Sequence, residues 1–208
     1  MTADDSDIPV TAEAPDSAFS VTGTDHITVI GSNEEDTVEF YRDVLGMPLV
    51  LRQPNLDAPD VTHLFFDTGD GRILTFFVEE SRDSSQAPQR TPLGGVHHLA
   101  FSIEASELQN IKEALQERNH GFNEFDRGAF HSLYTRDHNG LTIELVVDKY
   151  AIPDDRRGEV LALAHGKRVE AGDDYVDDPH MEAAIEELGL DVERADIPDA
   201  ATGTGYDD

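Results

Sequence analysis

The sequence predicts an α+β fold in which two repeated βαβββ modules form a curved mixed sheet, with further helices at the C-terminal end. Three observations support this fold class. Short runs rich in β-branched and aromatic residues alternate with one helical pattern in each half. The same order of elements occurs twice, and the periodicity becomes helical beyond Lys149. Half-structures of this kind do not each bury a full core, so we expect them to pair, either within one chain or by exchange across a dimer, since the linker permits both.

Composition divides the chain into the modules and less regular segments. The two ends are acidic or polar without periodicity, which predicts disordered tails, and a polar stretch with Pro and Gly predicts a linker. The predicted segments are 1–22 (tail), 23–80 (first module), 81–95 (linker), 96–149 (second module), 150–190 (helical extension) and 191–208 (tail).

The net charge of this 208-residue chain is −29, from 44 acidic and 15 basic residues. Such self-repulsion destabilises a compact fold in dilute buffer but is screened at molar salt, where the Debye length is about 3 Å. We therefore expect a cytoplasmic protein of a salt-loving organism. Nucleic acid is excluded as a partner, because binding a polyanion relies on Lys and Arg.

Two absences in the composition restrict the function further. The chain has no run of about 18 apolar residues and no signal-peptide pattern, so we expect a soluble, unsecreted protein that has no membrane partner. It also has no cysteine, so thiolate ligands, cysteine nucleophiles and disulfides are excluded. Any bound metal must be held by His, Asp or Glu.

The first module begins with a short apolar strand at 25–30. Ser32 and Glu35 have the spacing of a capping box, and the apolar residues that follow recur at helical spacing until Gly46. Three strands are predicted after this helix, at 48–53, 61–67 and 72–79.

The second module repeats this order. A strand at 96–103 precedes a helix whose capping pair is Ser106 and Gln109 and which ends near Gly121. The three strands that follow are predicted at 121–125, 130–136 and 141–147. Two helices are predicted in the extension, at 154–169 and 178–188.

The last two strands form a hairpin around the turn Asp137-His-Asn-Gly140. Its register decides the neighbour of Glu144, the one carboxylate within an otherwise apolar strand. A three-residue loop pairs Glu144 with Tyr134, whereas a two-residue Asn-Gly turn pairs it with Thr135. The functional interpretation below requires the first register.

Aligning the two modules by strand order places His26 opposite His98, Gly71 opposite Gly140, and Thr75 opposite Glu144. If the first strands lie side by side, His26, His98 and Glu144 converge inside the curved sheet. Two imidazoles and one carboxylate, with other coordination positions open, are what a non-haem Fe(II) centre requires. The sheet is therefore predicted to surround a metal site.

Four motifs now carry a family resemblance: Asp25-His-Ile27, Phe40-Tyr-Arg-Asp-Val-Leu-Gly46, His97-His-Leu-Ala-Phe101 and Asn139-Gly-Leu-Thr-Ile-Glu-Leu145. They resemble the vicinal oxygen chelate superfamily, which includes glyoxalase I, bleomycin-resistance proteins and type I extradiol ring-cleaving dioxygenases. The resemblance covers residues 24 to about 148 and implies the paired-module fold. The fold by itself does not give the function.

Within the superfamily, the resemblance implies a three-ligand metal site here. Glyoxalase-type sites have a fourth ligand at the position of Thr75, which is a poor ligand. The remaining set of His26, His98 and Glu144 is similar to the extradiol dioxygenase triad. The implied metal is Fe(II), with Mn, Zn or Ni as alternatives, and the implied protein is a homodimer.

A closer likeness is to the catechol- and hydroquinone-cleaving branch of these dioxygenases. It implies catalytic roles for His97, Thr28, Arg127 and Tyr134, while Asp25 stands where the branch often has a further His. The implied reaction opens the ring of a small aromatic diol with O2. In it, His97 moves protons, and Tyr134 and Arg127 stabilise the developing anionic oxygen.

Two other functions fit the same fold. A glyoxalase-like divalent-metal lyase or isomerase would need a fourth ligand from elsewhere, for which His63 is a candidate. A non-catalytic small-molecule-binding module would bind no metal at all. His131 alternates away from Tyr134 along its strand and is expected to be structural.

Overall fold

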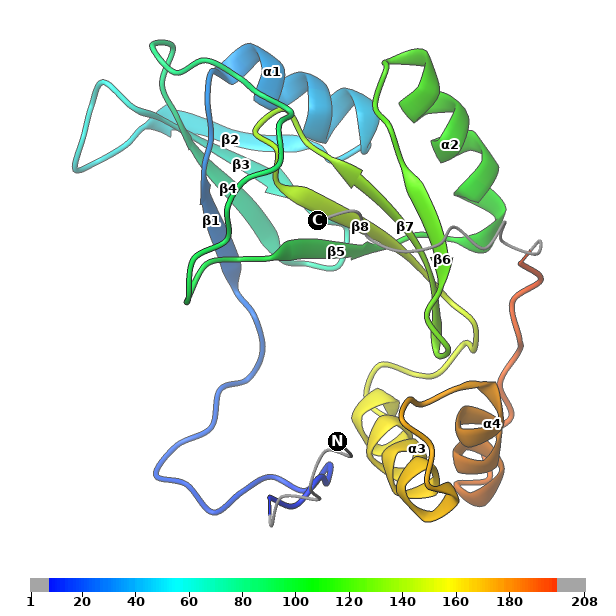
Figure 1. Ribbon diagram of the computed structural model, residues 1–208. Coiled ribbons are helices and arrows are strands. Elements are labelled where there is room, and N and C mark those ends of the chain that lie inside the picture. Colours follow the sequence, from blue (N-terminus) through cyan, green and yellow to red (C-terminus); the bar gives the residue numbers. More distant parts are fainter. Residues whose placement is uncertain (1–7, 198–208) are drawn as a thin grey trace.

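The computed structural model describes residues 8–197 and contains two four-stranded mixed sheets, one in each module (Figure 1). This confirms the predicted fold class. The elements of the first module are β1 His26–Ile30, α1 Glu34–Val38, η1 Glu39–Val44, β2 Leu49–Pro54, β3 Thr62–Asp67 and β4 Ile73–Val78. Those of the second are β5 His98–Ser102, η2 Ala105–Glu107, α2 Leu108–Glu117, β6 Asn123–Asp126, β7 Phe130–Arg136 and β8 Thr142–Asp148. The extension contains α3 Arg157–Ala171 and α4 Asp178–Glu187.

The two sheets have the same topology. The strand orders are β1-β4-β3-β2 and β5-β8-β7-β6, with the first strand of each module parallel to the last. Thr28 pairs with Thr75 in the first sheet, and Ala100 pairs with Glu144 in the second. Because both pairs lie two residues beyond the first histidine of the strand, Thr75 and Glu144 occupy equivalent positions.

The hairpin between β7 and β8 has the three-residue loop that the functional interpretation required. The Asp137 N–H donates to the Leu141 carbonyl at 3.0 Å, and Tyr134 lies opposite Glu144. Gly140 closes the turn with a φ of 76°, a conformation that favours glycine. The register therefore places the Tyr134 and Glu144 side chains on one face of the sheet.

Both helix starts differ from the predicted capping boxes. The first helix is capped by Asn33, whose side chain accepts the Asp36 N–H at 2.9 Å, and Ser32 instead contacts Ser84 at 2.7 Å. In the second module a 3-10 turn precedes α2, and its cap residue Glu107 makes no side-chain cap hydrogen bond. The capping pairs were wrong because other local hydrogen bonds compete for the same backbone groups.

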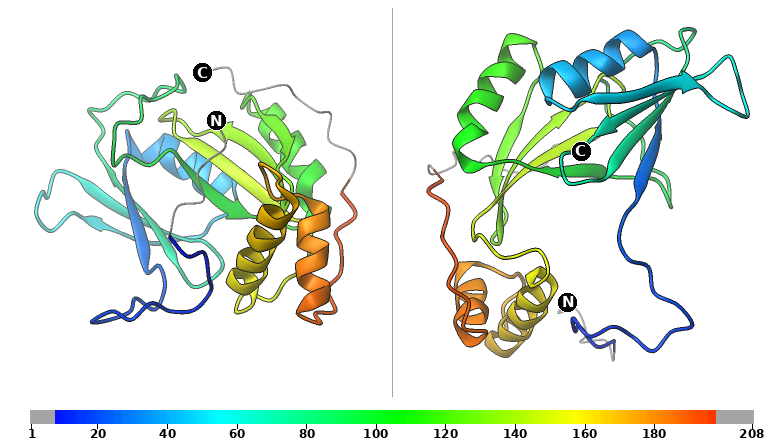
Figure 2. Two further views of the ribbon diagram at one scale, coloured as in Figure 1. Left: turned by 60° about the horizontal axis from the view of Figure 1, so that its bottom comes forward. Right: turned by 180° about the vertical axis from the view of Figure 1, so that it is seen from behind.

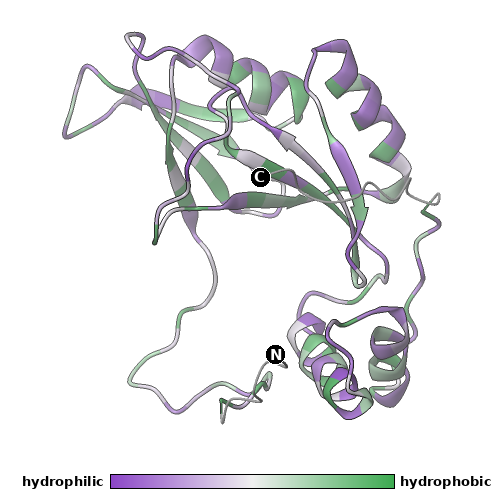
Figure 3. Cartoon of the chain, viewed as in Figure 1, coloured by the Kyte–Doolittle hydropathy of each residue, from purple (hydrophilic) through white to green (hydrophobic). Residues whose placement is uncertain are grey.

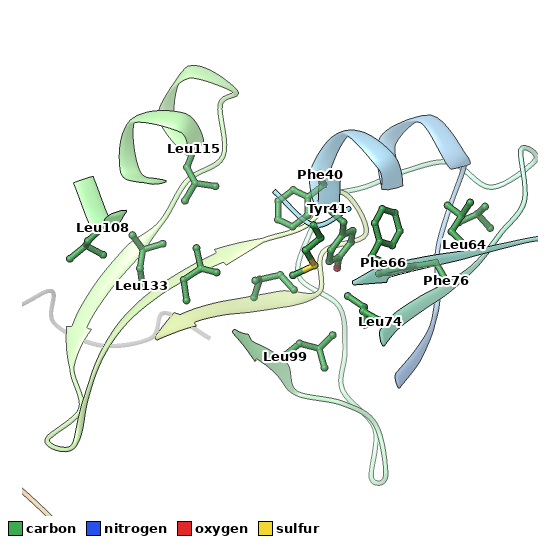
Figure 4. Close-up of a cluster of buried hydrophobic side chains, with 14 of the residues drawn as sticks. Phe40, Tyr41, Leu64, Phe66, Leu74, Phe76, Leu99, Leu108, Leu115 and Leu133 are labelled. Carbon is green, nitrogen blue, oxygen red and sulfur yellow. The ribbon is translucent and has the colours of Figure 1, made fainter. Parts of the chain in front are cut away.

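One continuous hydrophobic core joins the modules (Figure 4). It contains Phe40 and Tyr41 from η1 together with Leu99 of β5 and Leu133 of β7. The buried Tyr41 hydroxyl donates to Asp137 Oδ2 at 2.9 Å, across the junction of the modules. Along strands and helices, hydrophilic and hydrophobic residues alternate, as elements with one buried face require (Figure 3).

The C-terminal helices α3 and α4 pack on each other and on the end of the second module away from α1 (Figures 1 and 2). Their own cluster includes Val160 and Met181 together with Tyr150. Lys149 lies 2.7 Å from Asp126 and 3.0 Å from Asp178, which joins the β6–β7 turn to α4. None of the helices within residues 8–197 has the length and apolarity that a membrane span needs.

The predicted tails differ from the structure in part. Residues 8–22 are exposed and irregular. Residues 191–197, which the sequence placed in the C-terminal tail, run back along the second module, where Arg194 bridges to Tyr150 and the Ala195 N–H donates to Lys149. The remainder of both predicted tails, 1–7 and 198–208, lies outside the described residues.

Candidate metal centre

Glu144 is a nearly buried carboxylate on the inner face of the second sheet. It is 9% exposed, and both of its neighbours along β8, Ile143 and Leu145, point into the hydrophobic core on the other face. The Tyr134 hydroxyl donates to Glu144 Oε1 at 2.6 Å. A buried charge requires partners, and this hydrogen bond satisfies one carboxylate oxygen while the second stays available for a cation.

His98 approaches that second oxygen. Its Nε2 lies 3.0 Å from Glu144 Oε2, and its Nδ1 lies 2.8 Å from Nδ1 of His97. The two imidazole rings are nearly perpendicular, at 83°. A polar chain therefore runs from Tyr134 through Glu144 and His98 to His97. It contains three of the residues that the sequence singled out in this module besides Glu144 itself.

Arg127 completes the surroundings of this chain. Its guanidinium carbon lies 4.6 Å from the centre of the Phe125 ring and 5.4 Å from the centre of the Tyr134 ring. Cations at such distances are attracted by the ring faces. Burial raises the pKa of Tyr134, the hydrogen bond to Glu144 raises it further, and Arg127 lowers it. Tyr134 is thus held as a hydrogen-bond donor near neutral pH.

His26 stands apart from this cluster in the single chain, so its meeting with His98 and Glu144 at one metal stays a prediction. Its side chain is 55% exposed, and its Nδ1 lies 2.7 Å from the carboxylate of Asp25. Within residues 8–197, no group of three or more His, Asp or Glu side chains is placed to hold a metal ion. The physical reason is that β1 and β5 belong to separate sheets and form no ladder with each other.

The residue types and their tautomers nevertheless suit a divalent metal. Asp25 accepts from Nδ1–H of His26, which leaves Nε2 of that ring as the atom with a free lone pair. In the tautomer in which Nδ1 of His98 donates to Nδ1 of His97, Nε2 of His98, next to Glu144, has the lone pair that a metal needs. Imidazole and carboxylate donors backed by outer partners are typical of catalytic metal sites. The side chains of His26, His98 and Glu144 are therefore of a type that binds a divalent metal. In the single chain, however, His26 is not close to His98 and Glu144.

Thr75 has the role of an interior hydroxyl in the first sheet. It is fully buried and donates to the Thr28 hydroxyl at 2.8 Å, so its only acidic proton is used. The inner face of the first sheet therefore offers no carboxylate at the position equivalent to Glu144.

The two remaining histidine candidates lie in different settings. His131 is 2.7 Å from Glu124, which also binds Lys112, and this buried ion-pair group agrees with the structural role expected for it. His63 packs between Phe65 and Phe77, and burial lowers its pKa, as does the charge of the nearby His26. His63 therefore lies near His26, and its role as a fourth ligand stays a prediction.

A cavity of about 530 Å³ opens between the modules beside this cluster. It is lined by Thr28 of β1, by His97, and by Thr142, the residue that pairs with His98. Two arginines that the sequence analysis did not consider, Arg90 and Arg136, also line it. Their spacing carries no periodic signal, so only the positions of the linker and the hairpin bring them together.

Sequence analysis also missed the polar junction between the modules. His138 of the hairpin loop is 6% exposed, and its Nε2 lies 3.0 Å from Thr37 of α1 and 2.8 Å from Asn139. Burial lowers the pKa of His138, which favours its neutral form. The turn signal at Asp137–Gly140 already accounts for these residues as parts of a loop, and it carries no sign of their buried contacts with the first module.

Comparison with known proteins agrees with this geometry. The family model of the Glyoxalase/Bleomycin resistance protein/Dioxygenase superfamily matches residues 23–145, which include both modules up to β8. The chain belongs to this superfamily. The resemblance stated from the four motifs is thereby confirmed.

Two proteins of Bacillus subtilis (strain 168) are similar to parts of the chain. One is named "putative ring-cleaving dioxygenase MhqE" and is 30% identical over 97 residues, which are 45% of this chain and 31% of that protein. The other is named "putative ring-cleaving dioxygenase MhqA" and is 26% identical over 144 residues, which are 65% of this chain and 44% of that protein. The chain thus spans less than half the length of either relative.

Solved structures show the same fold. A structure titled as a putative dioxygenase from Bacillus subtilis matches with a TM-score of 0.53 and 26% identity, covering 60% of this chain and 40% of that one. A glyoxylase/bleomycin resistance protein/dioxygenase domain from Frankia matches with a TM-score of 0.53, covering 62% of this chain and 99% of that one. At 16% identity, the second match supports the fold alone.

Proposed function

We propose that this protein is an Fe(II)-dependent dioxygenase that opens the ring of a catechol or hydroquinone with O2. The observation that carries the proposal is the polar chain from Tyr134 through Glu144 and His98 to His97. Support comes also from the names of the two Bacillus relatives. Bound iron would supply a Lewis acid for the hydroxyls of an aromatic diol and a position for O2.

The residues of this chain would divide the remaining work. Glu144 and His98 would hold the metal, and the Tyr134 hydroxyl would fix the orientation of the carboxylate. His97 would accept a proton from the diol and return it later, because an imidazole nitrogen can both accept and donate a proton. Arg127, stacked against Tyr134, would stabilise negative charge on the substrate oxygens.

His26 would be the third ligand, and its source has two explanations. One is movement of β1 toward β5 on metal binding, which the shared cavity lined by Thr28 and His97 supports. The other is donation from a second copy of the chain in a homodimer, in which each module faces the other copy. Both place three protein ligands on the metal and leave positions for diol and O2.

The reaction is tested by loading the protein anaerobically with Fe(II) and measuring O2 uptake at high salt. Catechol and hydroquinone are compared with the methylglyoxal–glutathione adduct. We expect O2 uptake with a diol. In Glu144→Gln the rate of uptake should fall by more than about 100-fold, because losing a ligand costs more than the about 10- to 100-fold lost with a residue that only hydrogen-bonds a ligand. Thr75→Val, at the equivalent position of the first module, should keep full activity. Turnover of the adduct without O2 uptake would identify a glyoxalase-like enzyme instead, and failure to take up Fe(II) would indicate a binding module.

The source of His26 is tested by mixing two inactive variants, His26→Ala and Glu144→Gln, under conditions that exchange subunits. If ligands are shared between copies, hybrid dimers contain one intact site, and about a quarter of wild-type activity should return. If each chain completes its own site, every site in the mixture lacks either His26 or Glu144. Mixing then restores no activity.

A further inference from the structure

The cavity between the modules has an unusual charge for this protein. Sixteen residues line its volume of about 530 Å³, which is within the range of small-molecule sites. Among these described residues there is no Asp or Glu, although the whole chain has 44 of them. Arg90, Arg136 and His97 do line it. A cavity with two guanidinium groups and no carboxylate is electropositive in a chain of net charge −29.

The partners of the basic side chains single out the same two arginines. Ten of the 15 Lys and Arg residues lie within 4.0 Å of a carboxylate oxygen. Two of the other five, Arg90 and Arg136, have neither a carboxylate partner nor a side-chain hydrogen bond among residues 8–197. In so acidic a protein a guanidinium finds a carboxylate readily, so two unpaired ones on one cavity indicate a site for an external anion.

The rest of the wall suits an aromatic ring. Val29 and Ile30 of β1 and Leu141 at the end of the hairpin loop supply apolar surface, and Thr28 and Thr142 supply hydroxyls. Pro88 and Pro92 restrict the backbone of the linker on either side of Arg90. His97, which contacts the candidate ligand His98, lies on this wall, so the cavity reaches the side chain next to that ligand.

We propose that this cavity binds an aromatic carboxylate, with Arg90 and Arg136 holding the acid group and the ring directed toward His97. The substrate of the ring-opening reaction is then a hydroxylated aromatic acid rather than a neutral diol. This statement about the substrate rests on the proposed function, whereas the binding of the acid itself does not. Arginine is suited to the task because its planar fork matches a carboxylate with two parallel hydrogen bonds.

Binding to the metal-free 208-residue chain tests the proposal without any turnover. Calorimetric titrations compare 2,5-dihydroxybenzoate with its methyl ester, which has the same ring and hydroxyls but no charge. We expect the acid to bind about ten- to hundredfold more tightly than the ester, the range given by hydrogen bonds to charged groups. The preference should shrink as KCl is raised, because salt screens exposed charges. Equal affinity for acid and ester would overturn the proposal.

Two variants and one matched control assign the effect to the cavity. Arg90→Gln and Arg136→Gln should each lower the acid-to-ester ratio by about tenfold or more, with the affinity for the ester unchanged. Arg118→Gln serves as the control, since Arg118 also lacks a carboxylate within 4.0 Å in residues 8–197 but donates to the Ala114 carbonyl and does not line this cavity. A ratio that the cavity variants leave unchanged, or that the control lowers equally, would refute the assignment.

The same ratio separates this proposal from the proposed reaction. If the Fe(II)-loaded protein consumes no O2 with any diol but the acid preference remains, the dioxygenase assignment fails and the anion site stands. If O2 is consumed with hydroquinone while acid and ester bind equally, the reaction stands and the anion site fails.

Discussion

The second module carries Glu144 where the first carries Thr75. Glu144 pairs with Tyr134 across its sheet, and Thr75 pairs with Phe65. The backbone register around both positions is the same. In the first sheet the pair leaves a hydroxyl bonded to Thr28 beside an aromatic ring. In the second it leaves a carboxylate that accepts a hydrogen bond from a phenol and lies 3.0 Å from an imidazole nitrogen. A repeated scaffold therefore supplies the positions, and side chains at two paired positions decide which module presents a carboxylate there.

The equivalent turn glycines offer the largest contrast between the modules. Gly71 and Gly140 both have positive φ, at 81° and 76°, but a Cβ at Gly71 meets open space, whereas one at Gly140 collides with the backbone carbonyl oxygen of Ala87. Gly71→Ala should cost about 1–2 kcal/mol of unfolding free energy, from backbone strain alone. Gly140→Ala should cost about 2–3 kcal/mol more, because the linker must also move.

Urea unfolding of both variants at fixed high salt measures this difference. The wild-type protein and Gly71→Ala together provide the baseline for strain at positive φ. Equal losses in the two variants would mean that residues 85–89 of the linker do not pack on the hairpin in solution. That packing includes hydrogen bonds from Ser85 N–H to the His138 carbonyl, at 2.8 Å, and from the Gln89 side chain to the Asn139 carbonyl.

The hydrogen bond from Tyr134 to Glu144 gives the next contrast between the modules, in metal affinity. Tyr134→Phe removes the 2.6 Å hydrogen bond to the carboxylate and keeps the ring, so affinity for a divalent metal should fall by about 10- to 100-fold. Anaerobic titration with Fe(II) or Mn(II) measures the change. Thr75→Val removes the hydroxyl hydrogen bond of the first sheet and should leave metal affinity unaltered. Parallel losses in both variants would show that the modules contribute alike to the site.

The junction between the modules gives the smallest effect, a dependence of stability on pH. Burial lowers the pKa of His138 below its usual value of about 6.5, so the unfolded chain binds a proton more readily than the folded one. Its contribution to stability is therefore complete above about pH 6.5 and is lost as the pH falls toward the lowered pKa. His138→Gln should flatten the stability profile in this interval relative to wild type.

Unfolding by urea at a series of pH values measures that slope. His165, which lies on α3 outside the module junction, provides a matched control as His165→Gln. An unchanged slope in His138→Gln would mean that the hairpin loop does not pack against Thr37 in solution.

Much of the local structure follows from residue spacing alone. The positions of β7 and β8 agree with prediction to within one residue, because alternation and a turn signal depend only on neighbours in the chain. The same spacing put Tyr134 opposite Glu144 once the loop length was chosen. Helix starts were less predictable, since Ser32 bonds Ser84 instead of capping the first helix and Ser106 falls inside a 3-10 turn that precedes the second.

What the sequence by itself determined is the repeated βαβββ order, the absence of thiolate chemistry and the carboxylate of Glu144 on the strand position that faces Tyr134. The tertiary structure decided that His98 meets Glu144 while His26 stands apart, and that Arg90 and Arg136 share a cavity without carboxylates. These outcomes depend on how two sheets and a linker pack, and such contacts join residues far apart in the chain. No periodic pattern reports them, because periodicity describes one element at a time.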